Sequence, residues 1–208
     1  MSMDVANRLA AANQLHRFSR VLAACLMVVS GTLVTSAGAS DSQAALRVVH
    51  VRYGINKVQL TADGLRGMLV RARRDNGNAH GFDVLSIYAL ASSKENPEAN
   101  LLAVPVWGTG GEERMELTAG GGADCKLNDF RFIMESGKDL QLIAAEREFG
   151  SSFADDGFVT FTYFQLERNE DAEIGRPLYY FESVKTSRSA KKYCDVGEAF
   201  KMELGIEE

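Results

Sequence analysis

The segment 71–81, RARRDNGNAHG, contains the side chains in this sequence best suited to recognising an anion. Guanidinium groups form paired hydrogen bonds with carboxylates, and the amide and imidazole groups of the following turn can add single ones. The alternative is a sheet-edge strand kept soluble by its charge, with Asn and Gly serving the turn. The candidate contacts to a small anionic ligand or an acidic protein surface are Arg73, Arg74, Asp75, Asn78 and His80.

A second charged segment, AEREFGSSFADDG at 145–157, is acidic. Glu146 and Glu148 are two residues apart, which places both on one face of a strand, and Asp155 and Asp156 follow on a turn. Two carboxylates could form the acid and base of a glycosidase. Carboxylates at this spacing on a strand are more often a solvated edge. We therefore interpret Glu146 and Glu148 as partner-binding residues and predict no catalytic residues here.

The sequence offers no complete motif for covalent catalysis. It lacks the G-x-S-x-G elbow, and the S-x-x-K spacing from Ser189 to Lys192 has no S-D-N or K-T-G companion. The glycine-rich stretch before Cys125 lacks the G-K-[ST] of a phosphate-binding loop. His50 lies in an apolar run, where we expect a core residue, and His80 is the histidine best placed to exchange a proton. We predict a protein that is not an enzyme.

A strand–turn–strand pattern at 58–67, VQLTADGLRG, has the outline of a calcium-binding loop. Alignment on Asp63-Gly64 puts Gln59, Thr61 and Gly67 at the other ligand positions. One carboxylate supplies too little charge to dehydrate calcium, so we interpret the segment as a turn without metal. A structural zinc site is also disfavoured, because the short spacing of its ligands is missing. No metal and no cofactor is expected.

The first 39 residues have the layout of a secretory signal peptide. Arg17 and Arg20 precede the apolar run VLAACLMVVSGTLVT, and Ala37-Gly38-Ala39 is a small-x-small cleavage signal. The run has about 15 residues and a spanning helix needs about 20, which disfavours a membrane anchor. LAAC at 22–25 resembles a lipobox but has too short an apolar segment before it. We expect cleavage after Ala39 and a periplasmic protein with no integral membrane segment.

Removal of the leader changes the charge and leaves one domain. The chain has 23 basic and 28 acidic residues, and 20 and 27 of them remain in 40–208. An acidic domain does not suit a nucleic acid as a partner. We expect 40–208 to form a single β-rich domain. Of the three cysteines, Cys125 and Cys194 remain, and in an oxidising compartment they favour a disulfide over two buried thiols.

The elements that would position these residues are strands. Apolar residues occur in short or alternating runs separated by Gly, Asn and Asp. The expected strands are 46–53, 67–74, 82–90, 100–107, 114–118, 129–135, 139–148, 157–168 and 177–185. This leaves no room for crossover helices, so we predict an all-β fold, a mainly antiparallel β-sandwich or a curved open barrel.

Two features of this fold can be predicted more closely. The strand at 157–168 carries apolar residues on both faces, so we expect it to be central and covered on both sides. One short C-terminal helix is expected at 195–205. Asp195 would cap it, with Glu198 three residues later, and Gly205 would end it. A disulfide at Cys194 would then hold this helix to the loop around Cys125.

Four stretches together resemble one family of exported proteins. They are LTADGLRGMLVRARRDNGNAH, GGGADCKLNDFRF, AEREFGSSFADDGFVTFTYFQL and YYFESVKTSRSAKKYCDVGEAF. They are similar to the CarG-like proteins, the carbapenem intrinsic-resistance or self-resistance family, over about 48–204. The resemblance implies a periplasmic protein that protects its cell from a carbapenem without being a β-lactamase. It implies no particular ligand residues in this sequence.

Two classes of function remain open. A protective binding protein would hold a small anionic ligand, such as a carbapenem, in a concave pocket lined by the residues of 71–81 and by aromatics such as Trp107 or Tyr163. An inhibitor or immunity protein would neutralise a periplasm-acting toxin or cell-wall hydrolase. It would do so through a protruding loop carrying Glu146, Glu148, Asp155 or Asp156, directed at a basic enzyme cleft. The first class is our principal hypothesis.

Overall fold

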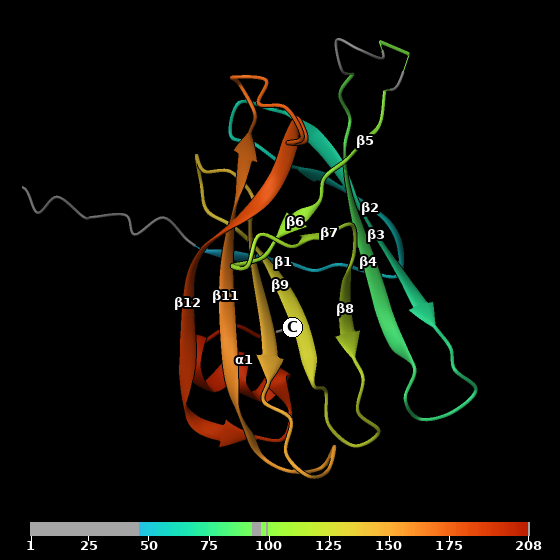
Figure 1. Cartoon of the computed structure of the whole chain (residues 1–208), viewed down its shortest axis with the longest axis vertical. Helices are drawn as coiled ribbons and strands as arrows, with labels where there is room; N and C mark the ends of the chain where they lie inside the picture. The colour runs from blue at the N-terminus through green and yellow to red at the C-terminus, as the bar shows by residue number, and fades with distance from the viewer. Residues whose placement is uncertain (1–45, 93–96, 99, 208) are drawn as a thin grey trace, which may run out of the picture. The chain divides into compact units, whose positions relative to one another are not determined.

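The computed structural model describes residues 46–92, 97–98 and 100–207 (Figure 1). In these residues twelve strands join into one mixed sheet, and a helix, α1 (Val196–Leu204), follows the last strand. The predicted all-β fold with a short C-terminal helix is confirmed. The predicted signal peptide at 1–39 lies outside the described residues. Within the described ranges, no helix is both long enough and apolar enough to span a membrane.

The sheet follows one path of ten strands with two short additions. The path is β2 (Gly54–Gln59), β3 (Arg66–Arg74), β4 (Phe82–Ala89), β8 (Leu117–Gly120), β9 (Asn128–Met134), β10 (Gln141–Arg147), β11 (Gly157–Arg168), β12 (Tyr179–Tyr193), β6 (Val106–Trp107) and β7 (Glu113–Arg114). β1 (Arg47–Val49) pairs with β9, and β5 (Leu102–Ala103) pairs with β4. The described pairings are antiparallel, apart from the parallel pair β6–β12.

The sheet bends sharply between β8 and β9. The described pairing of these strands is the single pair Gly120–Asn128. Gly120 and Gly121 have φ values of 114° and 91°, which glycine adopts without a side-chain clash. The halves on either side of this line share one apolar core, in which Leu85 of β4 and Phe181 of β12 are both fully buried. The result is an open, strongly curved sheet whose halves pack against each other.

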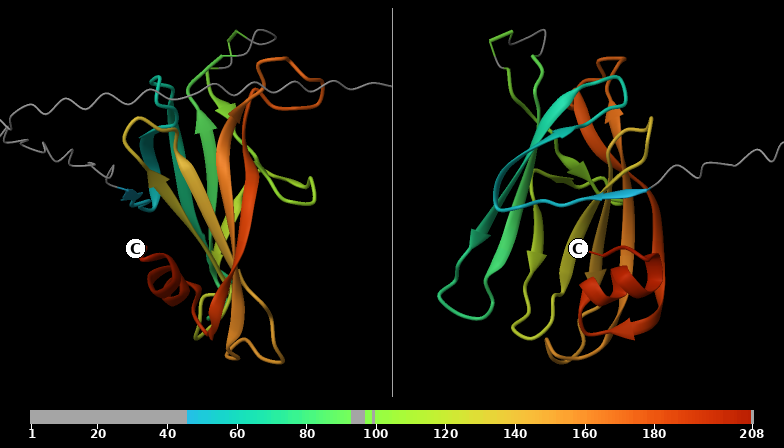
Figure 2. Two further views of the ribbon diagram at one scale, coloured as in Figure 1. Left: turned by 90° about the vertical axis from the view of Figure 1, so that its left-hand side faces the viewer. Right: turned by 180° about the vertical axis from the view of Figure 1, so that it is seen from behind.

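Helix α1 covers the other face of β9, β10 and β11 (Figure 2). Phe200 is fully buried there, and its ring centroid lies 5.4 Å from that of Phe161. The predicted helix ends are confirmed: the Asp195 side chain accepts a hydrogen bond from Gly197 N at 2.7 Å, and Gly205 takes the left-handed conformation. β11 therefore packs against α1 on one face through Val159 and Phe161, and against the main core on the other through Phe164 and Leu166.

The predicted disulfide between Cys125 and Cys194 is present, with the two Cα atoms 5.6 Å apart. It joins the β8–β9 loop to the residue before the helix cap. Two hydrogen bonds run beside it: Lys126 N donates to Asp195 Oδ2 at 3.0 Å, and Val196 N donates to Lys126 O at 3.1 Å. The bond holds the start of α1 to the loop around Cys125, as predicted.

Several strand limits differ from those expected. The segment 100–107 forms two short strands, β5 and β6, on different neighbours, and 114–118 is divided between β7 and β8. The strand expected at 177–185 continues to Tyr193 as β12. His50 was expected in the core, but β1 ends at Val49 and His50 is exposed. That prediction was wrong because Val49 and Val51 pack against the main core, and the residue between them points the other way.

Candidate functional site

Two arginines of β3 form ion pairs with a carboxylate inside the fold. Asp83 of β4 is buried and lies opposite Arg73 in the strand pairing. Arg71 Nη2 contacts Asp83 Oδ2 at 2.6 Å, and Arg73 Nη1 contacts Asp83 Oδ1 at 3.2 Å. The Tyr53 hydroxyl also donates to this carboxylate, at 3.0 Å. The Arg73 side chain stays 49% exposed, so a part of its guanidinium can still reach solvent.

This pairing makes the stability of the fold dependent on pH. Burial raises the pKa of Asp83, but the hydrogen bonds from Arg71, Tyr53 and Arg73 outweigh burial and hold the pKa below its usual value. A lowered folded-state pKa stabilises the fold above the unfolded-state pKa of about 3.9, and this stabilisation is lost as the pH falls through the folded-state value.

We therefore expect Asp83→Asn to cost stability mainly above about pH 5, with a difference from wild type that shrinks in acid. Urea unfolding at a series of pH values measures this difference. Asp171→Asn, which removes an equal charge from an exposed loop, is the control. A difference between wild type and Asp83→Asn that stays constant down to the acid limit would contradict the expectation.

The turn after β3 is closed by its own polar groups. Asp75 Oδ1 accepts from Gly77 N at 2.8 Å, and Asn78 Oδ1 accepts from His80 N at 2.9 Å. Arg74 hydrogen-bonds the Asn76 side chain. The ring of His80 lies 5.5 Å from that of Phe153, which belongs to the β10–β11 loop. The structure thus brings the predicted basic turn beside the loop that follows the predicted acidic residues.

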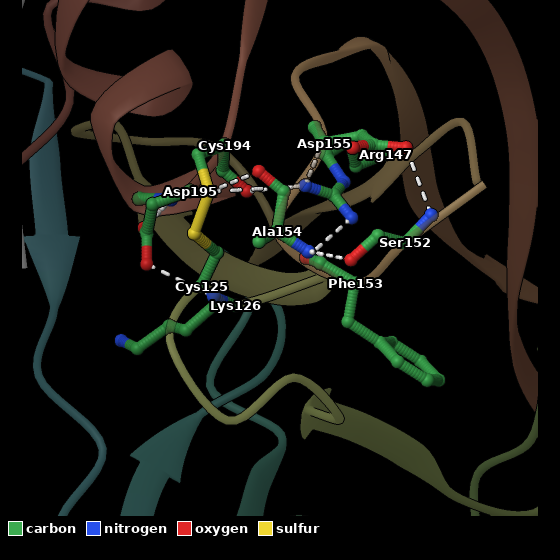
Figure 3. The surroundings of a disulfide bond; sticks show 10 residues. Cys125, Lys126, Arg147, Ser152, Phe153, Ala154, Asp155, Cys194 and Asp195 are labelled. Atoms are coloured by element: carbon green, nitrogen blue, oxygen red, sulfur yellow. Dashed lines mark hydrogen bonds between the residues drawn. A yellow bond between two sulfur atoms is a disulfide. The ribbon is translucent and has the colours of Figure 1, made fainter. Parts of the chain in front are cut away.

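The β10–β11 loop is held by Arg147, the buried last residue of β10 (Figure 3). Its guanidinium donates to Asp155 O, to Cys194 O at 3.1 Å and to Phe153 O at 2.9 Å. The loop is therefore connected both to itself and to the disulfide.

A second set of hydrogen bonds closes the same loop from within. Asp155 Oδ2 accepts from Ser151 Oγ, Ser151 N and Ser152 N, each at 2.8 Å. The bonds from Ser151 Oγ and Ser152 N are the main cause of the lowered pKa of Asp155. This carboxylate, which we expected on an exposed acidic turn, serves to fold the loop.

A pocket of about 880 Å³ opens on the curved inner face of β9–β12, where the main core ends. Its apolar side includes Leu117, Phe130 and Phe164, which are also buried members of the core. The β6–β7 segment forms part of its wall. Glu146 and Glu148 line this pocket, so both predicted partner-binding carboxylates lie in a concavity and not on a protruding loop.

Cross-strand pairing places polar groups in rows across the pocket. Asn128 of β9, Glu146 of β10 and Thr160 of β11 are register neighbours. Thr162 of β11 pairs with Thr186 of β12 in the next row. Asn128 Nδ2 donates to Thr118 Oγ1 at 3.3 Å, while Asn128 Oδ1 is a buried atom without a hydrogen-bond partner in the described structure. These hydroxyl and amide groups can donate and accept hydrogen bonds.

The charges on the pocket lining are mainly negative. Glu112 pairs with Arg114 at 3.0 Å, and Glu148 pairs with Arg188 at 2.7 Å. Asp129, a further carboxylate on the lining, pairs with Arg131 at 2.8 Å, and the remaining two are Glu116 and Glu146. Both are exposed, and neither has an ion-pair partner among the residues that the structure describes. The pocket therefore favours a positively charged group.

The remaining predicted residues lie elsewhere. Arg73, Arg74, Asp75, Asn78 and His80 are absent from the lining of this pocket. The Trp107 ring packs 5.4 Å from that of Tyr180, under the Arg176 guanidinium. The Tyr163 hydroxyl lies 3.4 Å from Ser187 Oγ. Neither aromatic lines this pocket, and no residue of 71–81 contributes to its lining.

The Asp63-Gly64 turn lines a second, smaller pocket of about 570 Å³. The Asp63 carboxylate accepts from the Thr61 hydroxyl, and this hydrogen bond is the main cause of its lowered pKa. Asp139 Oδ1 accepts from Ala62 N at 2.7 Å. In the described part of the chain, no three His, Cys, Asp or Glu residues are grouped so as to hold a metal ion.

Comparison with known proteins gives two matches. The family described as carbapenem resistance protein CarG-like matches residues 51–202. The crystal structure of CarG shares the fold, with a TM-score of 0.61 and 23% sequence identity, over 75% of this chain and 94% of that chain. At this identity the structural likeness concerns the fold. Among curated proteins the comparison found no match.

Proposed function

The chain belongs to the CarG-like carbapenem resistance family, and from this premise we propose that it protects its cell by binding, without hydrolysing the drug. The observation that carries the proposal is the pocket of about 880 Å³ at the end of the main core. Binding sites of this volume, apolar on one side with a few converging polar groups, are typical for ligands or inserted side chains. Its threonine hydroxyls and glutamates supply those polar groups.

The environment of the candidate catalytic groups supports binding over hydrolysis. The Ser189 hydroxyl, which starts the S-x-x-K spacing, is buried. It donates to Lys191 O at 2.6 Å and accepts from Val159 N at 2.9 Å, so it serves the β11–β12 pairing. Glu148 forms an ion pair with Arg188, so it is not a free second carboxylate beside Glu146. We propose that the protein is not an enzyme.

We also propose that it acts in the periplasm. The leader-like segment 1–39 and the disulfide between Cys125 and Cys194 support this location, since disulfides persist in oxidising compartments. A carbapenem on its way to the cell wall passes through the same compartment. The protein would meet there both the drug and the enzymes that the drug inactivates.

Filling the pocket tests this function. Thr162→Trp places a large ring on the inner face of β11, beside Ala144 and Thr186. When the full chain is expressed in a carbapenem-sensitive bacterium, we expect wild type to raise the carbapenem tolerance several-fold and Thr162→Trp to abolish most of this rise. The drug concentration in the medium, followed by chromatography, should stay unchanged in both cultures.

The matched control is Gln165→Trp, which introduces the same side chain at an exposed position of the same strand. It should keep the tolerance of wild type. Loss of drug from the medium in the presence of wild type would reject protection by binding. Full tolerance with a folded Thr162→Trp protein, verified by its unfolding curve, would reject this pocket as the site.

A second candidate function is an inhibitor or immunity protein against a periplasm-acting toxin or cell-wall hydrolase. Phe149 and Phe153 favour it, since they are 61% and 45% exposed on the loop beside the pocket. Large exposed aromatics next to a recess are common at protein interfaces. Both candidate functions would use the same concave surface.

A further inference from the structure

We propose that the pocket and its rim bind a basic, partly apolar polypeptide segment of another protein, with a lysine or arginine side chain inside the pocket. This inference rests on the proposed binding function and names the occupant. The rim is here the pair Phe149 and Phe153 on the β10–β11 loop. The inference depends on the charge of the pocket, the exposure of the rim and the rigidity of the loop that carries it.

The charge of the pocket favours a cationic group over the carboxylate of a carbapenem. A carbapenem carries a carboxylate, and the pocket presents Glu116 and Glu146 without described ion-pair partners. Like charges brought together in a recess repel each other, whereas an ammonium or guanidinium group would be attracted. The two glutamates come from distant parts of the sequence, Glu116 from the segment before β8 and Glu146 from β10. Both line the same pocket, so one cationic group inside it would be attracted by both.

The rim extends the contact surface beyond what a small molecule in the pocket can reach. Phe149 lines the pocket, and its ring centroid lies 5.0 Å from that of Phe153. Phe153 in turn lies 5.5 Å from His80, at the tip of the β3–β4 hairpin. The aromatic surface thus runs outward from the pocket. An apolar side chain on the same segment as the cation could rest on it, as in other interfaces with aromatic anchors.

The loop that carries the rim is fixed before any partner arrives. Arg147 is 3% exposed and donates to Phe153 O and to Cys194 O, and Asp155 closes the loop from inside (Figure 3). In Figure 3 the Phe153 side chain points away from these hydrogen bonds. A fixed backbone with its apolar rings outward loses little conformational entropy on binding. The fixed loop is therefore suited to an interface.

The test uses the purified full chain and a defined probe, a short synthetic peptide of lysine, leucine and glycine with a fluorescent label. A peptide with glutamate in place of lysine is the opposite-charge probe, and a carbapenem is titrated in parallel. We expect the lysine peptide to bind and the glutamate peptide to fail. The double substitution Glu116→Gln and Glu146→Gln should raise the dissociation constant of the lysine peptide at least about tenfold. Phe153→Ala should also raise the dissociation constant of this peptide.

The matched control removes the same charge at the other end of the sheet. Glu170 and Asp171 lie on the β11–β12 loop, whereas the pocket rim lies on the β10–β11 loop at the opposite end of β11 (Figure 1). Glu170→Gln with Asp171→Asn should leave the dissociation constant of the lysine peptide unchanged. In cells, the Glu116/Glu146 variant should lose carbapenem tolerance and the control should keep it.

The outcomes separate this inference from the function on which it rests. The proposal of a basic occupant would be rejected if the Glu170/Asp171 control weakened binding of the lysine peptide as much as the Glu116/Glu146 substitutions do. It would also be rejected if the lysine peptide did not bind at about 1 mM. A third outcome is that a carbapenem binds, that Thr162→Trp abolishes this binding, and that the Glu116/Glu146 substitutions leave it intact. This outcome would also reject the basic occupant, but it would agree with protection by binding. Tolerance that survives in a folded Thr162→Trp protein would reject this pocket as the site, and loss of carbapenem from the medium would overturn the proposed function itself.

Discussion

Replacing both Cys125 and Cys194 by serine is expected to lower the free energy of unfolding by about 4 kcal/mol. The bond closes a loop with a sequence separation of 69, so its loss returns much conformational freedom to the unfolded chain. It also removes the link between the β8–β9 loop and the start of α1. Urea unfolding followed through the fluorescence of Trp107, the single tryptophan, measures the loss.

A reductant provides the internal control for this prediction. Reduced wild type should unfold at the same urea concentration as the double serine variant, and the reductant should not shift the variant. A double serine variant as stable as oxidised wild type would contradict the structural role of the bond. Loosening of the 149–156 loop should accompany the loss, because Arg147 donates to Cys194 O at 3.1 Å.

Arg147→Met is expected to destabilise the fold by about 3 kcal/mol and to release the β10–β11 loop. Methionine keeps most of the apolar length of the side chain. It removes the donors that serve Asp155 O, Cys194 O and Phe153 O. Chymotrypsin cleaves after aromatic residues, so faster cleavage at Phe149 and Phe153 reports the release. The affinity for the lysine peptide should fall because the rim is no longer held in place.

Arg66→Met is the matched control for this substitution. Arg66 begins β3 and is exposed, so the same chemical change there should alter stability by less than about 0.5 kcal/mol. Unchanged cleavage at Phe149 and Phe153 in Arg147→Met would show that Asp155 and the serines hold the loop without Arg147. Equal destabilisation by both substitutions would show that the effect comes from charge and not from the buried hydrogen bonds.

The strands with strong apolar alternation could be predicted from sequence alone. The strand at 157–168 has the predicted limits, and the strands at 67–74 and 82–90 differ by one residue at one end. The segment 100–107 was misjudged because Pro105 lies between two pairings. Val104 N donates to Ile87 O, and Phe181 N donates to Pro105 O. The chain changes neighbours there, and an apolar run cannot reveal a change of partner.

The last part of β12 could not be predicted, because its sequence has no hydrophobic pattern. Residues 186–192, TSRSAKK, are polar, yet they pair with β11 because the Ser189 hydroxyl and the strand register hold them there. A strand whose outer residues face solvent gives no hydrophobic pattern. Its last residue, Tyr193, is buried beside α1. Helix α1 was easier to predict, because its cap and its final glycine are local signals.

The pocket could be predicted only in part. The spacing of Glu146 and Glu148 showed that they share a face, and both line the pocket. The residues opposite them, Thr118, Thr160 and Thr186, come from three strands, and their meeting depends on strand order and register. Asp83 was also missed as the partner of Arg71 and Arg73. A carboxylate opposite an arginine on a neighbouring strand can be recognised only once that pairing is known.

The shared core has a consequence for how the protein is made. The apolar face of β4, with Leu85 and Ile87, shares one core with Phe164 and Phe181, which come much later in the sequence. Until synthesis is nearly complete, the early hairpins can pair but cannot bury this face. Chains truncated by a premature stop codon before β11 should therefore be prone to aggregation and depend on chaperones. The nascent protein remains without a finished interior until its last quarter has been translated.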